Sequence, residues 1–216
     1  MTESSLKITE VFYSLQGEAR SSGMPTVFVR LTGCPLRCTY CDSEYAFFGG
    51  ERRDFSSLLQ EIAAHKAKYV CVTGGEPLAQ PEALNLLIKL CDAEYEVSLE
   101  TSGAMDVSKV DERVSIVLDL KTPASGEVSK NLYENLPLLR RKDQVKFVIC
   151  DRKDYEWARF KVDEYELCKR VGDIWFSPAY GDIEARVIAD WILEDKLNVR
   201  LQLQLHKQLW GDKPGV

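Results

Sequence analysis

Three cysteines are the residues of this sequence most suited to metal chemistry. Cys34, Cys38 and Cys41 lie in the segment GCPLRCTYCD with the spacing C-x₃-C-x₂-C. Thiolates are soft ligands that hold zinc or an iron–sulfur cluster. A structural zinc takes four protein ligands, and no fourth is obvious, since the two histidines are His65, in a helical pattern, and His206, near the C-terminus. A cluster held by three cysteines leaves one iron open to a further ligand, so we favour a cluster and keep zinc as the alternative.

The other cysteines lie in apolar segments and are expected to be small core residues; they are Cys71, Cys91, Cys150 and Cys168. An odd total of seven fits a reducing compartment better than a disulfide framework. The N-terminus lacks a charged-then-apolar signal sequence, and the apolar runs are far shorter than the ~20 residues of a membrane span. We therefore expect a cytoplasmic protein with no membrane partner.

The charge balance argues against nucleic acid as a partner. The chain has 28 Lys and Arg against 34 Asp and Glu, which gives a net charge of −6. It contains no basic run of the kind that follows a phosphate backbone. A small molecule is therefore the better expectation for the substrate.

Short β-rich runs alternate with segments of helical periodicity. The expected strands are 26–31, 69–72, 95–99, 115–120, 144–150, 173–176 and 199–205. The expected helices are 55–65, 82–91, 130–139, 154–169 and 183–194. This alternation predicts an α/β fold with a mostly parallel sheet. A full eight-stranded barrel needs ~250 residues, so we expect a partial, open β/α barrel.

Five polar or glycine-containing loops follow these strands, and they read TGCPLRC, TGGEP, ETSG, KTPASG and SPAYGD. In parallel α/β folds the loops at the carboxyl ends of the strands surround the active site. The length of 216 residues suits one sizeable core. We expect a single domain over 1–216, with a cluster loop at 33–43 and a C-terminal edge segment at 199–216. The alternating run RLQLQLH in the latter predicts an edge or antiparallel strand with one wet face.

The cysteine loop and TGGEP together resemble the radical S-adenosylmethionine (SAM) superfamily. An aromatic residue, Tyr40, precedes the third cysteine, and Thr73 to Pro77 directly follow a strand, as the glycine-rich motif of that superfamily does. A lone Gly-Gly pair more often marks a tight turn, but a strand, GGEP and a helix about 30 residues after the cysteine loop are more specific. The resemblance implies a [4Fe–4S] cluster whose open iron binds SAM and whose electron cleaves it to a 5′-deoxyadenosyl radical.

A longer series of motifs resembles one family within that superfamily, the 7-carboxy-7-deazaguanine synthases. SLQGE, FVRLTGC, CDS, CVTGGEP, LETSG and QLHK occur in the order of that family between Ile8 and Lys207. The resemblance implies a lyase that converts 6-carboxy-5,6,7,8-tetrahydropterin to 7-carboxy-7-deazaguanine with release of ammonia, in the biosynthesis of the tRNA base queuosine. It also implies a homodimer and a need for Mg²⁺, and we expect a reducing electron donor of the flavodoxin kind as a partner.

The resemblance assigns roles to individual residues, and none of them is catalytic beyond the cluster and SAM site. The implied cluster ligands are Cys34, Cys38 and Cys41, and the implied Mg²⁺ ligand is Ser43, where threonine is common in the family. The implied SAM contacts are Tyr40, Cys41, Asp42, Gly75, Glu76, Asp119, Lys121 and Ser177. The implied pterin contacts are Leu15, Gln16, Gly17, Glu18, Arg30, Thr73 and Glu100. Two loops depart from the family pattern, since DLKTP stands in place of SPK and SPAYGD in place of a QP loop.

Two cations in apolar runs need partners for physical reasons. Arg30 lies in VFVRLTG, where an unpaired charge is costly, and its planar fork suits a carboxylate or a pterin edge. Lys146 lies in VKFVIC, and Glu100 is its candidate partner or a hydrogen-bond acceptor for the pterin. His206 and Lys207 either line the pocket or close the last strand.

Two other protein classes are alternatives. An activase-type radical SAM protein, which takes hydrogen from a glycine of a partner protein, shares the cysteine loop but not LQGE or this C-terminal segment. A zinc-binding interaction module predicts a colourless protein and leaves TGGEP and LQGE without a role. Observed turnover of a small molecule would exclude the activase, and bound iron would exclude the zinc-binding module.

Overall fold

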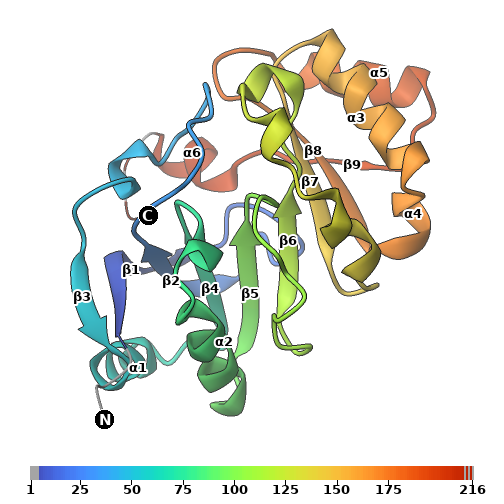
Figure 1. The fold of residues 1–216 in the computed structure, drawn as a ribbon. Coiled ribbons are helices and arrows are strands. Elements are labelled where there is room, and N and C mark those ends of the chain that lie inside the picture. The colour runs from blue at the N-terminus through green and yellow to red at the C-terminus, as the bar shows by residue number, and fades with distance from the viewer. Residues whose placement is uncertain (1–4, 212, 214, 216) are drawn as a thin grey trace.

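A nine-stranded sheet carries the fold of residues 5–211, 213 and 215, which are those that this computed structural model describes (Figure 1). Its strand order is β3-β1-β2-β4-β5-β6-β7-β8-β9. The strands are β1 (Ser5–Leu15), β2 (Pro25–Leu31), β3 (Glu51–Asp54), β4 (Tyr69–Gly74), β5 (Glu96–Thr101), β6 (Ser115–Asp119), β7 (Gln144–Ile149), β8 (Asp173–Pro178) and β9 (Arg200–Leu201). β1 is antiparallel to β2 and β3, whereas each neighbouring pair from β2 to β9 is parallel. The predicted open, mostly parallel sheet is confirmed.

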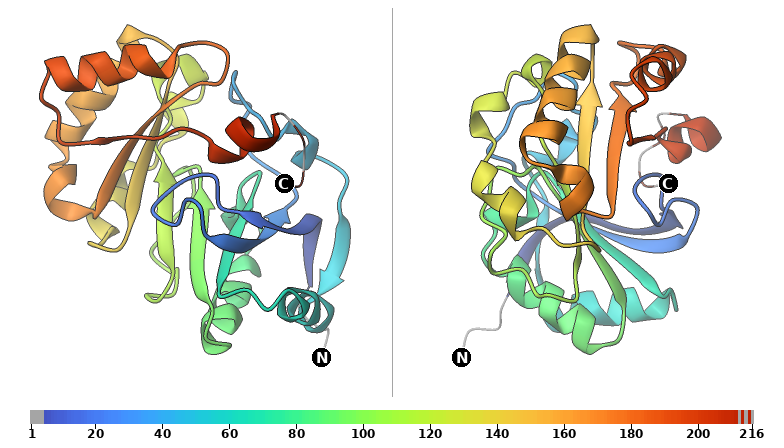
Figure 2. Two further views of the ribbon diagram at one scale, coloured as in Figure 1. Left: turned by 180° about the vertical axis from the view of Figure 1, so that it is seen from behind. Right: turned by 90° about the vertical axis from the view of Figure 1, so that its right-hand side faces the viewer.

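Helices cover the sheet and its ends. The α-helices are α1 (Phe55–Ala64), α2 (Ala83–Asp92), α3 (Arg152–Glu164), α4 (Leu167–Arg170), α5 (Ala185–Glu194) and α6 (Leu205–Trp210). The 3₁₀ helices are η1 (Glu44–Ala46), η2 (Pro77–Ala79), η3 (Pro123–Ser125), η4 (Val128–Lys130) and η5 (Tyr133–Leu138). Figure 2 shows α3 on one side of the sheet and α6 on the other. Within the described part of the chain, no helix has the length and apolar character that crossing a membrane requires.

The central strands are apolar on the face that packs into the core. In β2, Val27, Val29 and Leu31 are fully buried in the core on that face, whereas Phe28 and Arg30 on the alternate face line a cavity. Helix α2 adds its apolar face to the same core, with Leu86 and the neighbouring leucines fully buried. The core thus fixes the strands, and the polar loops at their carboxyl ends remain for the site.

The expected helices 130–139 and 154–169 differ from the structure. The first segment forms the 3₁₀ helices η4 and η5, and Pro137 lies inside η5. Proline lacks an N–H and its ring clashes with the preceding turn, so a regular α-helix cannot continue there. The second segment ends its helix at Glu164, and α4 starts after Glu166, which has a left-handed φ of 49°.

The C-terminal segment contains less strand than predicted. β9 lies at the sheet edge as expected, but it comprises two residues and is parallel to β8, so the antiparallel alternative is wrong. The chain leaves the sheet after Gln202, whose N–H still donates to the Phe176 carbonyl of β8, while its side chain accepts from the Ala19 N–H and its carbonyl accepts from Ser177 Oγ. Residues 212, 214 and 216 of the predicted segment 199–216 lie outside the described residues. β3, with the charged sequence ERRD, has no apolar alternation that would predict it.

The cysteines outside the cluster loop differ in exposure. Cys71 and Cys91 are buried, as predicted, and Cys150 is half-buried. Cys168 is exposed on α4, so the prediction that it is a core residue is wrong. All seven cysteines belong to the described residues, and each is unpaired.

Phe147 on β7 offers a test of this core. Its ring is fully buried and packs edge-on against Phe176 and Trp157. We predict that Phe147→Ala lowers the free energy of unfolding by about 3–5 kcal/mol, because truncation of a buried ring leaves a cavity. Urea denaturation measures the change. The control Phe160→Ala removes a ring that is 58% exposed on α3, and equal losses in the two variants would contradict this description of the core.

Candidate active site

A cavity of about 520 Å³ lies at the carboxyl ends of the parallel strands. All five predicted loops contribute to its wall, and the N-terminal segment after β1 and the C-terminal segment complete it. Every residue predicted for the site except Glu76 lines this cavity, namely Leu15, Gln16, Gly17, Glu18, Arg30, Cys34, Cys38, Tyr40, Cys41, Asp42, Ser43, Thr73, Gly75, Glu100, Asp119, Lys121 and Ser177. His206 and Lys207 line it as well, so the alternative in which they close the last strand is wrong.

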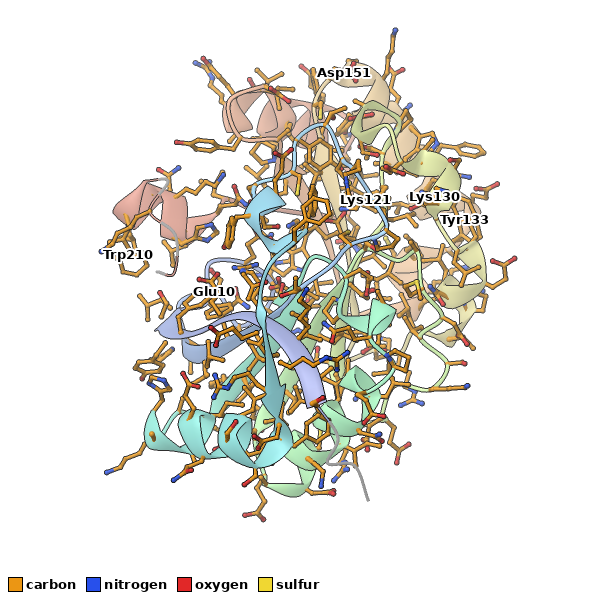
Figure 3. All side chains as sticks on the ribbon, turned by 60° about the vertical axis from the view of Figure 1, so that its left-hand side comes forward. Glu10, Lys121, Lys130, Tyr133, Asp151 and Trp210 are labelled. Atoms are coloured by element: carbon orange, nitrogen blue, oxygen red, sulfur yellow. The ribbon has the colours of Figure 1, made fainter. Side chains whose placement is uncertain are left out.

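The cysteine loop extends from β2 and is fastened to the loop after β6. The Thr39 N–H donates to the Ser125 carbonyl at 3.1 Å, and Thr39 Oγ1 donates to the Ala124 carbonyl at 2.8 Å. The Arg37 N–H donates to Glu127 Oε1 at 2.7 Å. These bonds hold the loop across the cavity, where Figure 3 shows it as a light-blue segment near the labelled Lys121.

The arrangement of the three thiols fits a cluster better than a single ion. Cys34, Cys38 and Cys41 are half-buried and face the same cavity. Among the described residues, however, no three His, Cys, Asp or Glu side chains converge closely enough to hold one metal ion. A zinc site requires four ligands about 2.3 Å or less from one ion, whereas the cysteines of a cluster bind different irons. The soft donor set therefore fits an iron–sulfur cluster.

Burial favours the protonated thiols of Cys34 and Cys38 when no metal is bound. Burial raises the pKa of Cys38 to about 11 and also raises the pKa of Cys34. The buried Lys121 ammonium acts in the opposite direction on both thiols. Because metal ligands must be thiolates, cluster binding at this site is coupled to proton release.

The glycine-rich turn after β4 lies directly against the cysteine loop. The Gly75 N–H donates to the Leu31 carbonyl at 3.2 Å, and the Glu76 N–H donates to the Gly33 carbonyl at 2.8 Å. A Cβ on Gly74 would lie 2.3 Å from the Leu31 carbonyl oxygen, and one on Gly75 would lie 2.3 Å from that of Gly33. Gly74 also has φ +151°. The close backbone approach therefore explains both glycines.

Glu76 does not face the cavity, which corrects its predicted role as a SAM contact through its side chain. It is fully buried, and its carboxylate accepts hydrogen bonds from the Leu78 N–H, from Thr101 Oγ1, and from both the N–H and the hydroxyl of Ser102. A carboxylate with this many donors has no capacity left for a ligand. Glu76 instead joins the turn after β4 to the end of β5.

Asp119 and Lys121 form a buried pair at the end of β6. Lys121 Nζ lies 3.0 Å from Asp119 Oδ2 and 5.9 Å from the centre of the Tyr40 ring. Although burial alone would lower it, Asp119, Tyr40 and Cys38 together raise the pKa of Lys121, so it is a cation. Asp119 Oδ1 is buried without a hydrogen-bond partner among the described residues. A buried, unpaired carboxylate oxygen at a cavity wall suits a polar ligand that donates to it.

Polar side chains on the opposite wall present a set of hydrogen-bonding groups. Glu100 accepts from Thr73 Oγ1 at 3.0 Å and from Gln16 Nε2 at 3.3 Å. Arg30 Nε donates to Glu10 Oε1 at 2.7 Å, and Tyr45 donates to the same oxygen at 2.8 Å. Glu10, labelled in Figure 3, thus supplies the partner that the Arg30 charge needs.

The partner of Lys146 is Glu18, so the prediction of Glu100 for that role is wrong. Lys146 Nζ donates to Glu18 Oε2, and Gln202 Nε2 donates to the same oxygen at 3.1 Å. Burial would raise the pKa of Glu18, but the Lys146 charge and hydrogen bonds from Lys146 and Gln204 lower it to about 2. Glu18 is therefore ionised, and it holds Lys146, Gln202 and Gln204 together although they are distant from it in sequence.

Sequence reasoning missed Glu10, Tyr45, Gln202 and Gln204. The first two have no motif of their own and become relevant once β1 and η1 lie beside Arg30. The glutamines lie in the run RLQLQLH, where they are the polar half of a strand pattern. The alternation of these glutamines with leucines indicates one polar face, but the pattern does not show that this face contacts Glu18.

Comparison with known proteins agrees with this geometry. The profile of the radical SAM superfamily matches residues 28–124. The 7-carboxy-7-deazaguanine synthase of Chlorobaculum tepidum is 41% identical over 219 residues, which cover 100% of this chain and 99% of that protein. The enzyme of the same name from Thermoplasma acidophilum is 40% identical over 212 residues, which cover 97% of this chain and 99% of that protein.

A solved structure supports the same fold. The crystal structure of QueE from Escherichia coli superposes with a TM-score of 0.74 and 23% sequence identity, and the match covers 94% of this chain and 95% of that one. The open, mostly parallel sheet is therefore shared with a protein of related size.

The Glu18–Lys146 pair predicts a dependence of stability on pH. Because the pKa of Glu18 falls from its ordinary 4.5 to about 2 on folding, its contribution to stability is complete above about pH 5 and is lost as the pH falls toward 2. We predict that the double variant Glu18→Gln, Lys146→Met has a smaller slope of unfolding free energy between about pH 5 and pH 2 than the wild type.

Urea denaturation at a series of pH values measures that slope. The matched control is Glu61→Gln, Arg53→Met, which removes a more exposed ion pair. A wild-type slope in the Glu18, Lys146 double variant would show that Glu18 is not the anchoring anion.

Proposed function

The chain belongs to the 7-carboxy-7-deazaguanine synthase family of radical SAM enzymes, and from this membership we propose how its residues carry out the reaction. The enzyme converts 6-carboxy-5,6,7,8-tetrahydropterin to 7-carboxy-7-deazaguanine with release of ammonia, a step in queuosine biosynthesis. The observation that carries the proposal is that the three cysteines, the glycine-rich turn and the LQGE segment line the same cavity.

The cofactors occupy the side of the cavity formed by the cysteine loop. Cys34, Cys38 and Cys41 ligate the [4Fe–4S] cluster. When bound, the cluster and SAM supply a carbon-centred radical that removes a hydrogen atom from the substrate. The residues that hold SAM on this wall are Tyr40, Asp42, Gly75, Asp119, Lys121 and Ser177. The unpaired Asp119 Oδ1 supports this assignment, because a hydroxyl or amino group of SAM would satisfy it.

The pterin occupies the opposite side. Glu100 and Gln16 offer a carboxylate and an amide, and these groups suit the amino and ring N–H groups of a pterin edge. Arg30 and Thr73 bind its polar edge or carboxylate, while Leu15 and Gly17 contact the ring. The carboxylate of Glu18 is hydrogen-bonded to Lys146, Gln202 and Gln204. Glu18 therefore acts on the pterin through these three residues.

Ser43 binds Mg²⁺ together with the carboxylate of the substrate. Mg²⁺ prefers oxygen ligands and is often held by few protein groups, with water and substrate completing its shell. Ser43 Oγ lies in the cavity wall, 3.9 Å from Cys41 Sγ.

The enzyme acts as a cytoplasmic homodimer that receives electrons from a flavodoxin-like donor. The unpaired state of its seven cysteines supports a reducing compartment. The dimer is what the family resemblance implies, and a reducing donor is needed because the cluster must deliver an electron to SAM.

Anaerobic turnover tests the function. Reconstituted protein is mixed with SAM, reductant, Mg²⁺ and 6-carboxytetrahydropterin, and products are followed by mass spectrometry. We predict formation of 7-carboxy-7-deazaguanine by the wild type and a loss of about 10³-fold or more in Cys38→Ala, since radical formation requires the cluster. Formation of 5′-deoxyadenosine without 7-carboxy-7-deazaguanine would show that 6-carboxytetrahydropterin is not the substrate. A protein that carries its cluster and forms neither product nor 5′-deoxyadenosine would instead favour an activase.

The magnesium proposal has its own test in the same assay. Ser43→Ala is expected to raise the Mg²⁺ concentration for half-maximal rate by about tenfold, in the range typical for removal of a metal-site group. Ser43→Thr keeps the hydroxyl and should retain the wild-type requirement. Equal Mg²⁺ dependence in the wild type and Ser43→Ala would exclude Ser43 as a ligand.

A further inference from the structure

Gln204 lies between two carboxylates that belong to different walls of the cavity. Its Nε2 is 2.8 Å from Glu18 Oε1 and 3.0 Å from Asp42 Oδ2. A carboxylate only accepts hydrogen bonds, whereas an amide nitrogen has two protons to donate. The amide nitrogen of Gln204 therefore satisfies both carboxylates at once and holds them at a fixed separation.

Each of these carboxylates is attached to one half of the site. Asp42 lies between Cys41, a cluster ligand, and Ser43 in the chain. Glu18 follows the pterin segment Gln16–Gly17 and is half-buried, with its carboxylate hydrogen-bonded to Lys146 and Gln202. The Gln204 bridge thus connects the cofactor loop to the substrate segment, which lie far apart in the sequence.

The backbone around Gln204 makes this bridge rigid on the substrate side. The Leu205 N–H donates to the Gly17 carbonyl at 2.9 Å. A Cβ on Gly17 would lie 2.0 Å from His206 Nδ1, so the two segments are in close contact. On the cofactor side, Lys207 Nζ lies 3.9 Å from the same Asp42 oxygen, and its charge adds to the hold on that loop.

We propose that Gln204 is a positioning residue that sets the distance between the SAM side and the pterin side of the cavity. This inference rests on the proposed function, because it requires a radical from SAM to meet a hydrogen atom of the substrate. Transfer of that atom needs near-contact geometry, and a misplacement of about 1 Å can cost about 10²-fold. Loss of the Gln204 bridge should therefore uncouple SAM cleavage from product formation, so that SAM is cleaved without formation of the deazaguanine.

The ratio of 5′-deoxyadenosine to 7-carboxy-7-deazaguanine measures this separation. In coupled turnover the hydrogen atom returns and SAM is regenerated. In uncoupled turnover the C5′–S bond of SAM breaks, and SAM⁺ takes up two electrons and one proton to give methionine and 5′-deoxyadenosine. Dithionite in the assay supplies the electrons, and solvent supplies the proton.

The test variants are Gln204→Glu, which replaces the donor with a third carboxylate, and Gln204→Met, which removes the donor without adding charge. The matched control is Gln208→Glu, the same change at an exposed position one turn later in α6. Each protein is assayed anaerobically after its iron content and circular dichroism are matched to the wild type.

We expect both Gln204 variants to release about tenfold or more 5′-deoxyadenosine per product, with the ratio of Gln208→Glu equal to that of the wild type. An unchanged ratio of 5′-deoxyadenosine to 7-carboxy-7-deazaguanine in folded, cluster-loaded Gln204→Met would overturn the proposal. This holds even if the amounts of both products fall in parallel, because a purely structural role lowers them together. A wild type that forms no deazaguanine would overturn the proposed function instead.

Discussion

The close backbone contact between the glycine-rich turn and the cysteine loop is the constraint on which the site depends. Gly75 and Glu76 donate from their N–H groups to the carbonyls of Leu31 and Gly33, and no side chain fits between the two segments. The contact fixes where the cysteine loop leaves β2. The Glu76 carboxylate then extends it to Thr101 and Ser102, so the ends of three neighbouring strands become one rigid wall.

Largely buried ion pairs organise the remaining walls. Lys121 pairs with Asp119, Lys146 with Glu18, and Arg30 with Glu10. Removing charges from water costs several kcal/mol per ion, so such pairs contribute little net stability, whereas breaking one is strongly destabilising. Their value here is positional, because each cation is held in place before any ligand binds. A preorganised polar site of this kind loses little free energy to reorganisation when substrate enters.

The sequence predicted the open, mostly parallel sheet and the five loops that form much of the cavity wall. Apolar runs followed by polar loops identify strand ends, and the carboxyl ends of parallel strands must meet at one edge, so the five loops could be placed together. The pairing of buried charges could not be predicted. Lys146 needs a partner on energetic grounds, but the choice of Glu18 over Glu100 depends on how the segment after β1 folds over β7. The role of Glu76 was missed for a similar reason, since a motif gives a residue type and not the direction of its side chain.

In the proposed function, Cys34, Cys38 and Cys41 hold a [4Fe–4S] cluster with one iron open to SAM. Electron paramagnetic resonance of the reduced, reconstituted protein, recorded with and without SAM, is the decisive test. We expect a cluster signal whose g-values change when SAM is added, because SAM would bind the open iron. A cluster signal that is identical with and without SAM would contradict the open site, and bound zinc in place of iron would contradict the cluster itself.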